Sequence, residues 1–265
     1  MADVDVVVVN YRTPADLDAF CSTLKLQSAD FSAWIVNVSP TIADLEVAKR
    51  HSDVFKHVVF HQNVGYGRAC NYGASLGTAP IIALFNADVL FPQTNSLGDI
   101  VEAMQRNPDW AIVGPRQVNS EGLLTHAGID GTNKDPAFRA WMSREDFTDT
   151  VECVSVMGAA YFARRDVWEE LGNCEKYNEW YQSSGLSLSR LGAFLPTPLY
   201  YEDMWCSLHA RAHGHKVMYY GGTTLVHEWH QSIRKHLNEQ QADIKFQEAR
   251  NFFRSCCRHH GIECE

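Results

Sequence analysis

The chain of 265 residues is long enough for one large α/β domain or two small ones, and its composition, with 45% apolar and 21% charged residues, is ordinary for a globular protein. The formal net charge of −9 argues against a protein that binds nucleic acid regardless of sequence, because such proteins need a basic surface. The acidic opening Met1–Asp5 is unlike a secretory signal, and no apolar run approaches the about 18 residues of a membrane span. We therefore expect a cytoplasmic protein.

Strands and helices alternate along the first third of the chain. Runs of apolar, mostly β-branched residues predict buried strands at Asp5–Asn10, Trp34–Val38, Val58–Phe60 and Ile81–Phe85. The helices expected between them begin at Pro14 with Thr13 as N-cap, cover Ile42–Arg50, and run from a glycine-containing stretch at Asn63–Asn71 to Leu76. This alternation implies right-handed crossovers and an α/β fold with a mostly parallel sheet.

The remainder of the chain is less regular. The polar segment Glu121–Glu152 contains several glycines and is expected to form a long functional loop, and Ser183–Pro198 also has a loop-like composition. Helices and strands are predicted at Leu97–Arg106, Trp110–Val113, Arg165–Leu171, Glu202–Ala212, Val217–Tyr220, Thr223–Val226 and about Leu237–His259, the last ended by Gly261. No repeat and no clear boundary interrupts the chain, so we expect a single domain.

The apolar run Ile81–Phe85 is followed closely by one carboxylate, Asp88. A carboxylate at the end of a buried strand needs a cation as partner, and this edge of an α/β sheet is where ligands bind. An acid pair, Glu202 and Asp203, and the imidazole of His227 are enough to complete a site. The alternatives are that Asp88 caps a turn and that the acid pair is favoured by the dipole of its helix.

Cysteine and histidine residues suggest weaker sites. The eight cysteines are scattered without paired metal spacing, so most are expected to be core thiols. His209, His213 and His215 place two imidazoles one helical turn apart, which would suit a metal pair. A second set has residue types that bind zinc, although its spacing is not that of a standard finger: Cys256, Cys257, His259, His260 and Cys264. The alternative for this set is a basic, partly buried tail helix.

Eight blocks in chain order resemble family 2 glycosyltransferases of the GT-A fold, most closely the rhamnosyltransferase-type members. The blocks are Val6–Pro14, Asn63–Gly73, Leu84–Val89, Val113–Pro115 with Glu121–Gly122, Met157–Arg165, Tyr200–Gly214, Val226–Ser232 and Ala249–Gly261. The order of these blocks over almost the whole chain carries the resemblance.

The resemblance implies a single GT-A domain over residues 1–265, with a nucleotide-sugar-binding half at about 1–115 and an acceptor half with the C-terminal helix at about 116–265. It implies inverting transfer of a hexosyl or deoxyhexosyl group from a nucleotide-diphosphate sugar, with a UDP- or dTDP-linked donor expected. The acceptor would be a hydroxyl group on an unidentified molecule. The oligomeric state stays open, and a homo-oligomer is compatible with the sequence.

The resemblance also assigns roles to residues. Asp88 would hold Mg²⁺ or Mn²⁺ on the donor diphosphate, with His227 as a further metal contact and His230 as a weaker candidate. Asp203 would be the general base, with Glu202 as the alternative. The donor would be bound by residues from several of the blocks: Asn10, Arg12, Asn37, Asn63, Gly65, Arg68, Asn86, Ala87, Gly158 and Ala159.

Some positions depart from the family pattern. Asn86 and Asn37 stand where relatives often have aspartate, and Trp205 stands where another acid is common, so Trp205 either stacks on an acceptor or packs in the core. A nucleotidyltransferase is an alternative, but it would need a glycine-rich phosphate loop, and Asn10–Pro14 contains no glycine. A catalytically silent nucleotide- or sugar-binding module is the other alternative. Acceptor selectivity is expected in the two loop-like segments.

Overall fold

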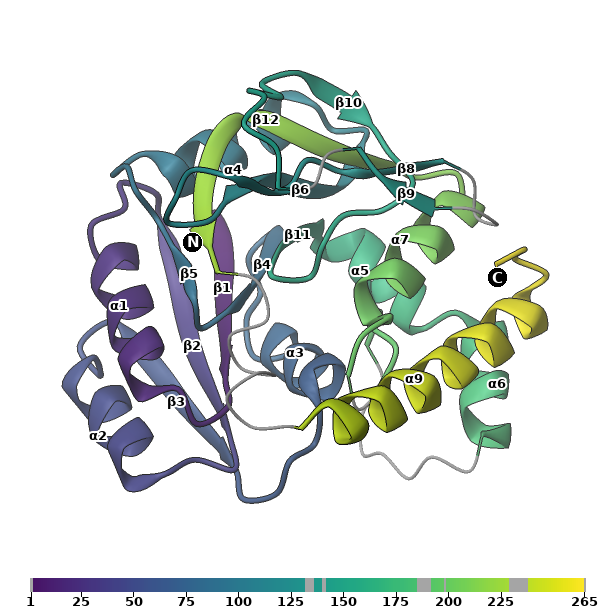
Figure 1. Ribbon diagram of the computed structural model, residues 1–265, viewed down its shortest axis with the longest axis horizontal. Helices are drawn as coiled ribbons and strands as arrows, with labels where there is room; N and C mark the ends of the chain where they lie inside the picture. Colours follow the sequence, from purple (N-terminus) through teal and green to yellow (C-terminus); the bar gives the residue numbers. More distant parts are fainter. Residues whose placement is uncertain are drawn as a thin grey trace.

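The computed structural model describes residues 2–131, 136–139, 142–184, 192–197, 199–228 and 238–264 (Figure 1). Its strands are β1 Val4–Asn10, β2 Phe31–Val38, β3 Phe55–Phe60, β4 Ile81–Asn86, β5 Val89–Leu90, β6 Trp110–Val118, β7 Leu124–His126, β8 Ile129–Gly131, β9 Pro136–Phe138, β10 Thr150–Glu152, β11 Ala160–Arg164 and β12 Lys216–His227. Its helices are α1 Pro14–Leu24, α2 Ile42–Arg50, α3 Tyr66–Ala74, α4 Ser96–Arg106, α5 Arg165–Gly172, α6 Glu175–Ser183, α7 Glu202–Ala212 and α9 Glu239–His260.

One large sheet runs through the molecule (Figure 1). Its order over the described residues is β10-β12-β6-β11-β4-β1-β2-β3, with β5 beside β12 and β7 beside β6. The strands β3, β2, β1 and β4 are parallel, whereas β11 is antiparallel to both β4 and β6. The predicted α/β fold with a mostly parallel sheet is therefore confirmed, and the sheet combines strands from both halves of the chain.

Both faces of the sheet are covered, which explains why β1 is apolar at four successive positions from Val6 to Val9. Val6 and Val8 belong to a core with residues of α1, α2 and α4. Val7 and Val9 belong to a second core with residues of α3, α5 and α7. Successive side chains of a strand point to opposite faces, so a strand between two helical layers is apolar on both faces. The two polar residues of β1, Asp5 and Asn10, are buried near its ends and are hydrogen-bonded there.

A third core cluster lies away from the sheet, where α6, α7 and α9 pack together (Figure 1). The helix α9 begins with a capping box formed by Asn238 and Gln241, and it ends at Gly261, whose φ of 71° closes the last turn. The predicted tail helix is thus confirmed to within about two residues at each end. Within the described residues, no helix has both the length and the apolar composition needed to span a bilayer.

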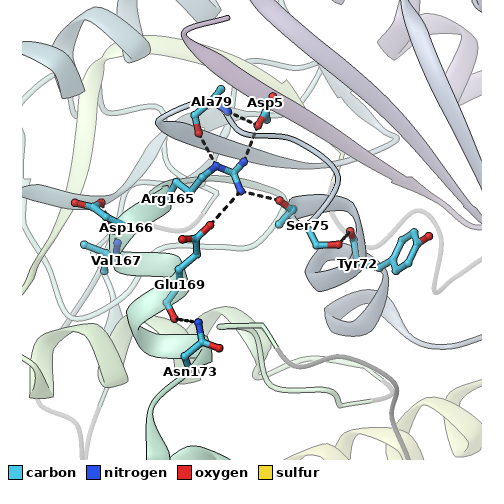
Figure 2. Close-up of polar contacts among 10 residues, drawn as sticks. Asp5, Tyr72, Ser75, Ala79, Arg165, Asp166, Val167, Glu169 and Asn173 are labelled. Atoms are coloured by element: carbon cyan, nitrogen blue, oxygen red, sulfur yellow. Dashed lines mark hydrogen bonds and ion pairs between the residues drawn. The ribbon is translucent and has the colours of Figure 1, made fainter. Parts of the chain in front are cut away.

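A buried ion pair joins the beginning of β1 to the beginning of α5 (Figure 2). Arg165 Nη2 lies 2.6 Å from Asp5 Oδ2, and the two side chains are 13% and 3% exposed. The same guanidinium donates to the carbonyl oxygens of Ala79 and Ala74, at 2.6 and 2.9 Å, and Ala79 N–H donates to Asp5 at 2.7 Å. A Cβ on Gly77 would lie 2.1 Å from Asp5 Oδ2, so the close approach requires glycine there.

The neighbouring Arg164 braces the same edge of the sheet. It donates to the carbonyl oxygens of Trp110 and Asn107, at 3.0 and 3.1 Å, and also to that of Met104. The paired arginines therefore hold together the edge at which the parallel strands begin, and they lie away from the strand ends where ligands bind in such sheets.

Several sequence expectations need correction. Thr13 does not cap α1 through its side chain, because its hydroxyl instead donates to Asn10 Oδ1 at 2.8 Å. The segment Glu121–Glu152 is not wholly irregular, since it contributes β7 and β10 to the large sheet, while β8 and β9 pair with each other. Strands of three residues are too short to show an alternating pattern. The two pieces predicted around Val217–Val226 form one strand, β12, whose register shifts between Tyr220 and Thr224.

Other expectations lie wholly or partly outside the described residues. His230 falls within 229–237, which the structure does not describe, and the segment Ser183–Pro198 is described only at 183–184 and 192–197. The helix α6 was not predicted, although Tyr177, Trp180 and Tyr181 recur at helical spacing and are buried.

Candidate active site

The pairing of β5 with β12 brings Asp88 and His227 together. In this antiparallel pair His227 lies opposite Val89, so its ring is next to the residue that precedes Val89. His227 Nε2 is 3.5 Å from Asp88 Oδ1, and the two side chains are 4% and 8% exposed. Asp88 and His227 are 139 positions apart in the sequence, and they form a buried pair at the edge where β4 ends.

The pairing of β4 with β11 places a glycine–alanine segment at the same edge. Asn86 N–H donates to Ala159 O at 3.0 Å, which sets Ala159 beside the residues that lead to Asp88. The hydroxyl of Tyr66, the first residue of α3, donates to Gly158 O at 2.7 Å. The beginnings of α3 and β11 and the end of β4 therefore meet at this edge.

Asp203 is connected to this segment by a short hydrogen bond. Gly158 N–H donates to Asp203 Oδ2 at 2.6 Å, and Met204 N–H donates to Asp203 Oδ1 at 2.7 Å. A Cβ on residue 158 would lie 3.2 Å from Asp203 Oδ2, so the absence of a side chain at Gly158 permits the contact. Burial raises the pKa of Asp203, and these backbone N–H groups oppose that rise by stabilising the carboxylate.

Glu202 occupies a different environment from its neighbour. Its side chain is buried, with the residue 7% exposed, and Thr197 Oγ1 donates to Glu202 Oε2 at 3.3 Å. Burial, followed by the charge of Asp203, raises the pKa of Glu202 to about 8. Glu202 is therefore mainly protonated at neutral pH, which leaves Asp203 as the better proton acceptor of the two.

This raised pKa has a consequence for stability. A group whose pKa is higher in the folded state stabilises the fold below its ordinary pKa, and that stabilisation is lost as the pH rises through the folded-state value. For Glu202 this window is about pH 4.5 to 8. We expect Glu202→Gln to have a higher melting temperature than wild type, by a difference that grows as the pH rises through this window. Each kcal/mol gained in the free energy of unfolding corresponds to about 2–4 °C. Thermal melts at several pH values measure the margin. Glu102→Gln, at an exposed carboxyl, serves as the control, and a margin that does not change with pH would contradict the expectation.

The acid pair follows an unusual stretch of backbone. Tyr200 and Tyr201 have φ angles of 66° and 68°, in the left-handed region that bulky residues rarely adopt. Rings of α9 pack against them: Tyr201 stacks on Phe253 at 4.9 Å, and Tyr200 contacts Phe246 at 5.7 Å between ring centroids. Strain of this kind persists only where the surroundings hold it, and here it fixes the direction in which α7 and its acids start.

Asn10 and Asn37 form part of a buried polar network at the ends of β1 and β2. Both are 0% exposed. Asn10 Nδ2 donates to Asn37 Oδ1 at 2.6 Å and to Asp44 Oδ1 at 2.8 Å, while Asn37 Nδ2 lies 2.9 Å from His57 Nε2. The structure thus places both asparagines beneath the surface, where they join the two strand ends. Asp44 was not predicted, although its capping-box spacing from Thr41 is visible in the sequence.

The other predicted donor residues lie around this edge. Arg12, which is exposed, donates to Ser39 O at 2.9 Å and to Ser39 Oγ at 3.0 Å. Asn63 Oδ1 accepts from Gly65 N–H at 3.0 Å, and Gly65, with a φ of 81°, immediately precedes α3. Arg68 is half-buried on α3, and its Nε has no hydrogen-bond partner among the described residues.

Trp205 does not reach the surface. It is 0% exposed and packs in the third core cluster, with its ring 4.7 Å from that of His209 and 5.5 Å from that of Tyr177. Of the two roles that the sequence left open for Trp205, the structure supports core packing, and stacking on an acceptor would require Trp205 to leave that core.

Comparisons with known proteins place this geometry in context. The sequence model described as "Glycosyl transferase family 2" matches residues 5–172, which is more than half of the chain. No curated protein matches the chain. The matched residues end before α7 begins, so the placement of Asp203 and His227 comes from the structure itself.

Similar solved structures share the fold. One is the mannosyltransferase PcManGT from Pyrobaculum calidifontis in complex with GDP-Man and Mn²⁺, with 14% identity and a TM-score of 0.58 over 97% of this chain and 74% of that chain. Another is S. aureus TarS 1-349, with 12% identity and a TM-score of 0.61 over 98% of this chain and 74% of that chain. At such identities the likeness concerns the fold, and the expected GT-A arrangement of one sheet with helices on both faces is confirmed.

Proposed function

Because this chain belongs to glycosyl transferase family 2, we propose that it transfers a sugar, with inversion, from a nucleotide-diphosphate donor to an acceptor hydroxyl. The observation that carries the proposal is the meeting of two pairs at one edge of the sheet. Asp88 lies with His227 where β4 ends, and Asp203 is hydrogen-bonded to Gly158 where β11 begins. The backbone bond from Asn86 to Ala159 joins these pairs. The first pair suits the donor diphosphate, and the second suits the acceptor.

The Asp88–His227 pair fits a divalent cation, Mg²⁺ or Mn²⁺. Asp88 Oδ1 and His227 Nε2 are 3.5 Å apart. Adjacent ligands of an octahedral cation with bonds of about 2.1 Å lie about 3 Å apart, so a small adjustment accommodates the ion. A cation held there would offset the charge that develops on the leaving nucleotide diphosphate. The similar fold that was solved with GDP-Man and Mn²⁺ supports this assignment.

Asp203 would accept the proton of the attacking hydroxyl. Its two oxygens are held by the N–H groups of Gly158 and Met204, which fix the direction of the remaining lone pairs. Inverting transfer is a single displacement, so one base is sufficient and no covalent intermediate is required. Glu202, protonated and bonded to Thr197, would support the position of Asp203 rather than replace it.

The donor would lie across the ends of β1, β2 and β4. Arg12, Asn63 and Arg68 offer polar groups from the loops and the helix at this edge, and a guanidinium suits phosphate oxygens. Gly65, Ala87, Gly158 and Ala159 would leave room for the donor. The buried Asn10 and Asn37 would act by holding the strand ends in place. Most contacts to the donor would come from residues up to about 115, and the acceptor would be bound by residues after about 116. Finer expectations stay predictions: a UDP- or dTDP-linked hexosyl or deoxyhexosyl donor, a rhamnosyltransferase type and a cytoplasmic location.

A thermal-shift panel tests the metal and donor roles together. Nucleoside diphosphates of uridine, thymidine and guanosine, and their sugars, are compared with and without Mn²⁺. A ligand at about 100 times its dissociation constant adds about 2.7 kcal/mol of stability, which is readily measured. We expect a Mn²⁺-dependent shift for the nucleotide of the true donor, and we expect Asp88→Asn to lose it.

Asp53→Asn is the matched control, because Asp53 is an exposed carboxylate that pairs with Lys25 at 2.6 Å. It should keep the shift. If Asp88→Asn binds the nucleotide with undiminished Mn²⁺ dependence, Asp88 does not hold the cation. Release of nucleoside diphosphate on turnover then separates a transferase from a silent binding module, which binds the donor without consuming it.

A further inference from the structure

A cysteine–histidine cluster lies outside the proposed active site, where α6 meets α7. Cys174 Sγ and one ring nitrogen each of His209 and His213 all lie within 4.8 Å of one another. Cys174 immediately precedes α6, His209 lies in the last turn of α7, and His213, one turn further on, is the residue that follows the helix. The sequence indicated the histidine pair, but Cys174 joins it only through the packing of the two helices.

The hydrogen bonds of His213 leave one ring nitrogen ready for a metal. His213 Nδ1 lies 2.9 Å from Glu170 Oε1, and the other oxygen of Glu170 is 2.9 Å from His215 Nε2. An ionised carboxylate can only accept, so Nδ1 of His213 carries the proton and Nε2 keeps its lone pair. A carboxylate behind a histidine in this way is typical of the surroundings of metal ligands.

His209 has no other evident role for its polar atoms. It is 1% exposed, and neither of its ring nitrogens has a hydrogen-bond partner among the described residues. A buried polar group without a partner is costly, so one that persists calls for a ligand or another explanation. Burial lowers the pKa of His209 to about 3, and the imidazole is accordingly neutral at physiological pH.

His260, the last residue of α9, lies beside the cluster. Its ring centroid is 5.1 Å from that of His209. Its Nδ1 is 2.9 Å from Cys256 O, and because a carbonyl only accepts, Nδ1 carries the proton and Nε2 keeps a lone pair. That Nε2 is buried and has no hydrogen-bond partner within the described ranges.

We propose that these side chains bind Zn²⁺, with Cys174, His209, His213 and His260 as the four ligands. Thiolate and imidazole are the ligands that zinc prefers, whereas Mg²⁺ and Mn²⁺ favour oxygen. In a tetrahedral zinc site with bonds of about 2.0 to 2.3 Å, neighbouring ligand atoms lie about 3.5 Å apart. The separations within 4.8 Å among Cys174, His209 and His213 therefore need only side-chain rotation, and the ring of His260 would have to move closer to complete the set. The rings of Trp205 and Tyr177 pack against His209 and shield the cluster.

The ion would have a structural role. Four protein ligands leave no position open for a substrate, as in other structural zinc sites. The ligands come from the start of α6, from α7 and from the end of α9, so the ion would fasten the C-terminal helix to the helix that begins with Glu202 and Asp203. This inference does not depend on the proposed transfer reaction.

The test uses the full chain without a histidine tag, stripped of metal by a chelator and then titrated with Zn²⁺ against a chromophoric competitor. We expect one tightly bound zinc per chain and a higher melting temperature in its presence. Cys174→Ser and His213→Ala should each weaken binding by a factor of about 100 or more, and His260→Ala by a factor of about 10 or more. Cys264→Ser, at another half-buried cysteine, is the matched control and should bind as wild type does.

Cobalt distinguishes this cluster from the Asp88–His227 pair. Co²⁺ bound at the cluster should give a thiolate-to-cobalt charge-transfer band, which Cys174→Ser abolishes and Asp88→Asn retains. Cys174 and His213 are partly exposed, so Cys174→Ser and His213→Ala should fold. Far-ultraviolet circular dichroism verifies the fold of both variants. An absence of tight zinc binding, or unchanged affinity in folded Cys174→Ser and His213→Ala, would overturn the proposal.

Discussion

Replacing Asp203 by asparagine is expected to lower turnover by a factor of about 10² to 10⁴ while donor affinity stays near that of wild type. Asparagine has the same shape, and its oxygen can still accept the N–H of Gly158 that lies 2.6 Å from the carboxylate. The bond lost is the one from Met204 N–H, because the amide nitrogen that replaces Oδ1 cannot accept it. The substitution removes the proton acceptor and leaves the Asp88–His227 pair unchanged. Release of nucleoside diphosphate measures turnover, and calorimetry measures donor binding.

The pH dependence of the wild-type reaction provides a second measurement of the same role. A base must be deprotonated to act, and burial raises the pKa of Asp203. The value of kcat/KM should therefore fall as the pH is lowered through that raised pKa. Asp109→Asn, which removes an exposed partner of Lys216, is the control and should leave turnover unchanged. Near wild-type turnover in Asp203→Asn would show that another group is the base.

Replacing Arg165 by methionine is expected to lower the free energy of unfolding by about 3 to 5 kcal/mol. The substitution leaves the carboxylate of Asp5, only 3% exposed, without its cation in the interior. It also removes the donors to the carbonyl oxygens of Ala79 and Ala74. Urea denaturation followed by circular dichroism measures the loss, provided that the slope of the transition is unchanged.

Two comparisons make this result specific to the buried pair. Arg106→Met removes an exposed partner of Glu102 on α4 and should cost about 0 to 1 kcal/mol. The double variant Asp5→Asn with Arg165→Met removes both charges and should recover part of the loss, because no unpaired ion remains. A loss below about 1 kcal/mol for Arg165→Met would mean that Asp5 is not held as a buried charge.

The sequence was most informative where a helix or strand is long and apolar on one face. The bounds of α2 and α7 were predicted to the residue, because capping residues and a breaker mark their ends. The sequence was less informative where a segment becomes a strand only because it pairs with a neighbouring strand. The three-residue strands β7 and β10 exist because β6 and β12 offer edges for pairing, and no local pattern reveals which edge is free.

The same distinction between local pattern and long-range pairing applies to the candidate site. Its residue types were predictable: an acid after an apolar strand, an acid pair at a helix start and a histidine at a strand end. Their geometry was not, since the contact of His227 with Asp88 depends on the register of β5 against β12. The bond from Gly158 to Asp203 is donated by a backbone N–H, which every residue except proline possesses, so the residue type does not predict the bond. The left-handed Tyr200 and Tyr201 have no sequence signal, because neither residue type favours that conformation.

The order of strands in the sheet also bears on how the protein is made. The strands β6 and β12 are adjacent, and Arg116 of the first bonds Thr224 of the second although they are 108 positions apart. Contacts of such long range form slowly, because a long loop must close before they are gained. During synthesis on the ribosome the strands β1 to β4 emerge before Asp203 and His227. A nascent chain that has not yet reached these residues would therefore display a partial sheet without both pairs of the proposed site.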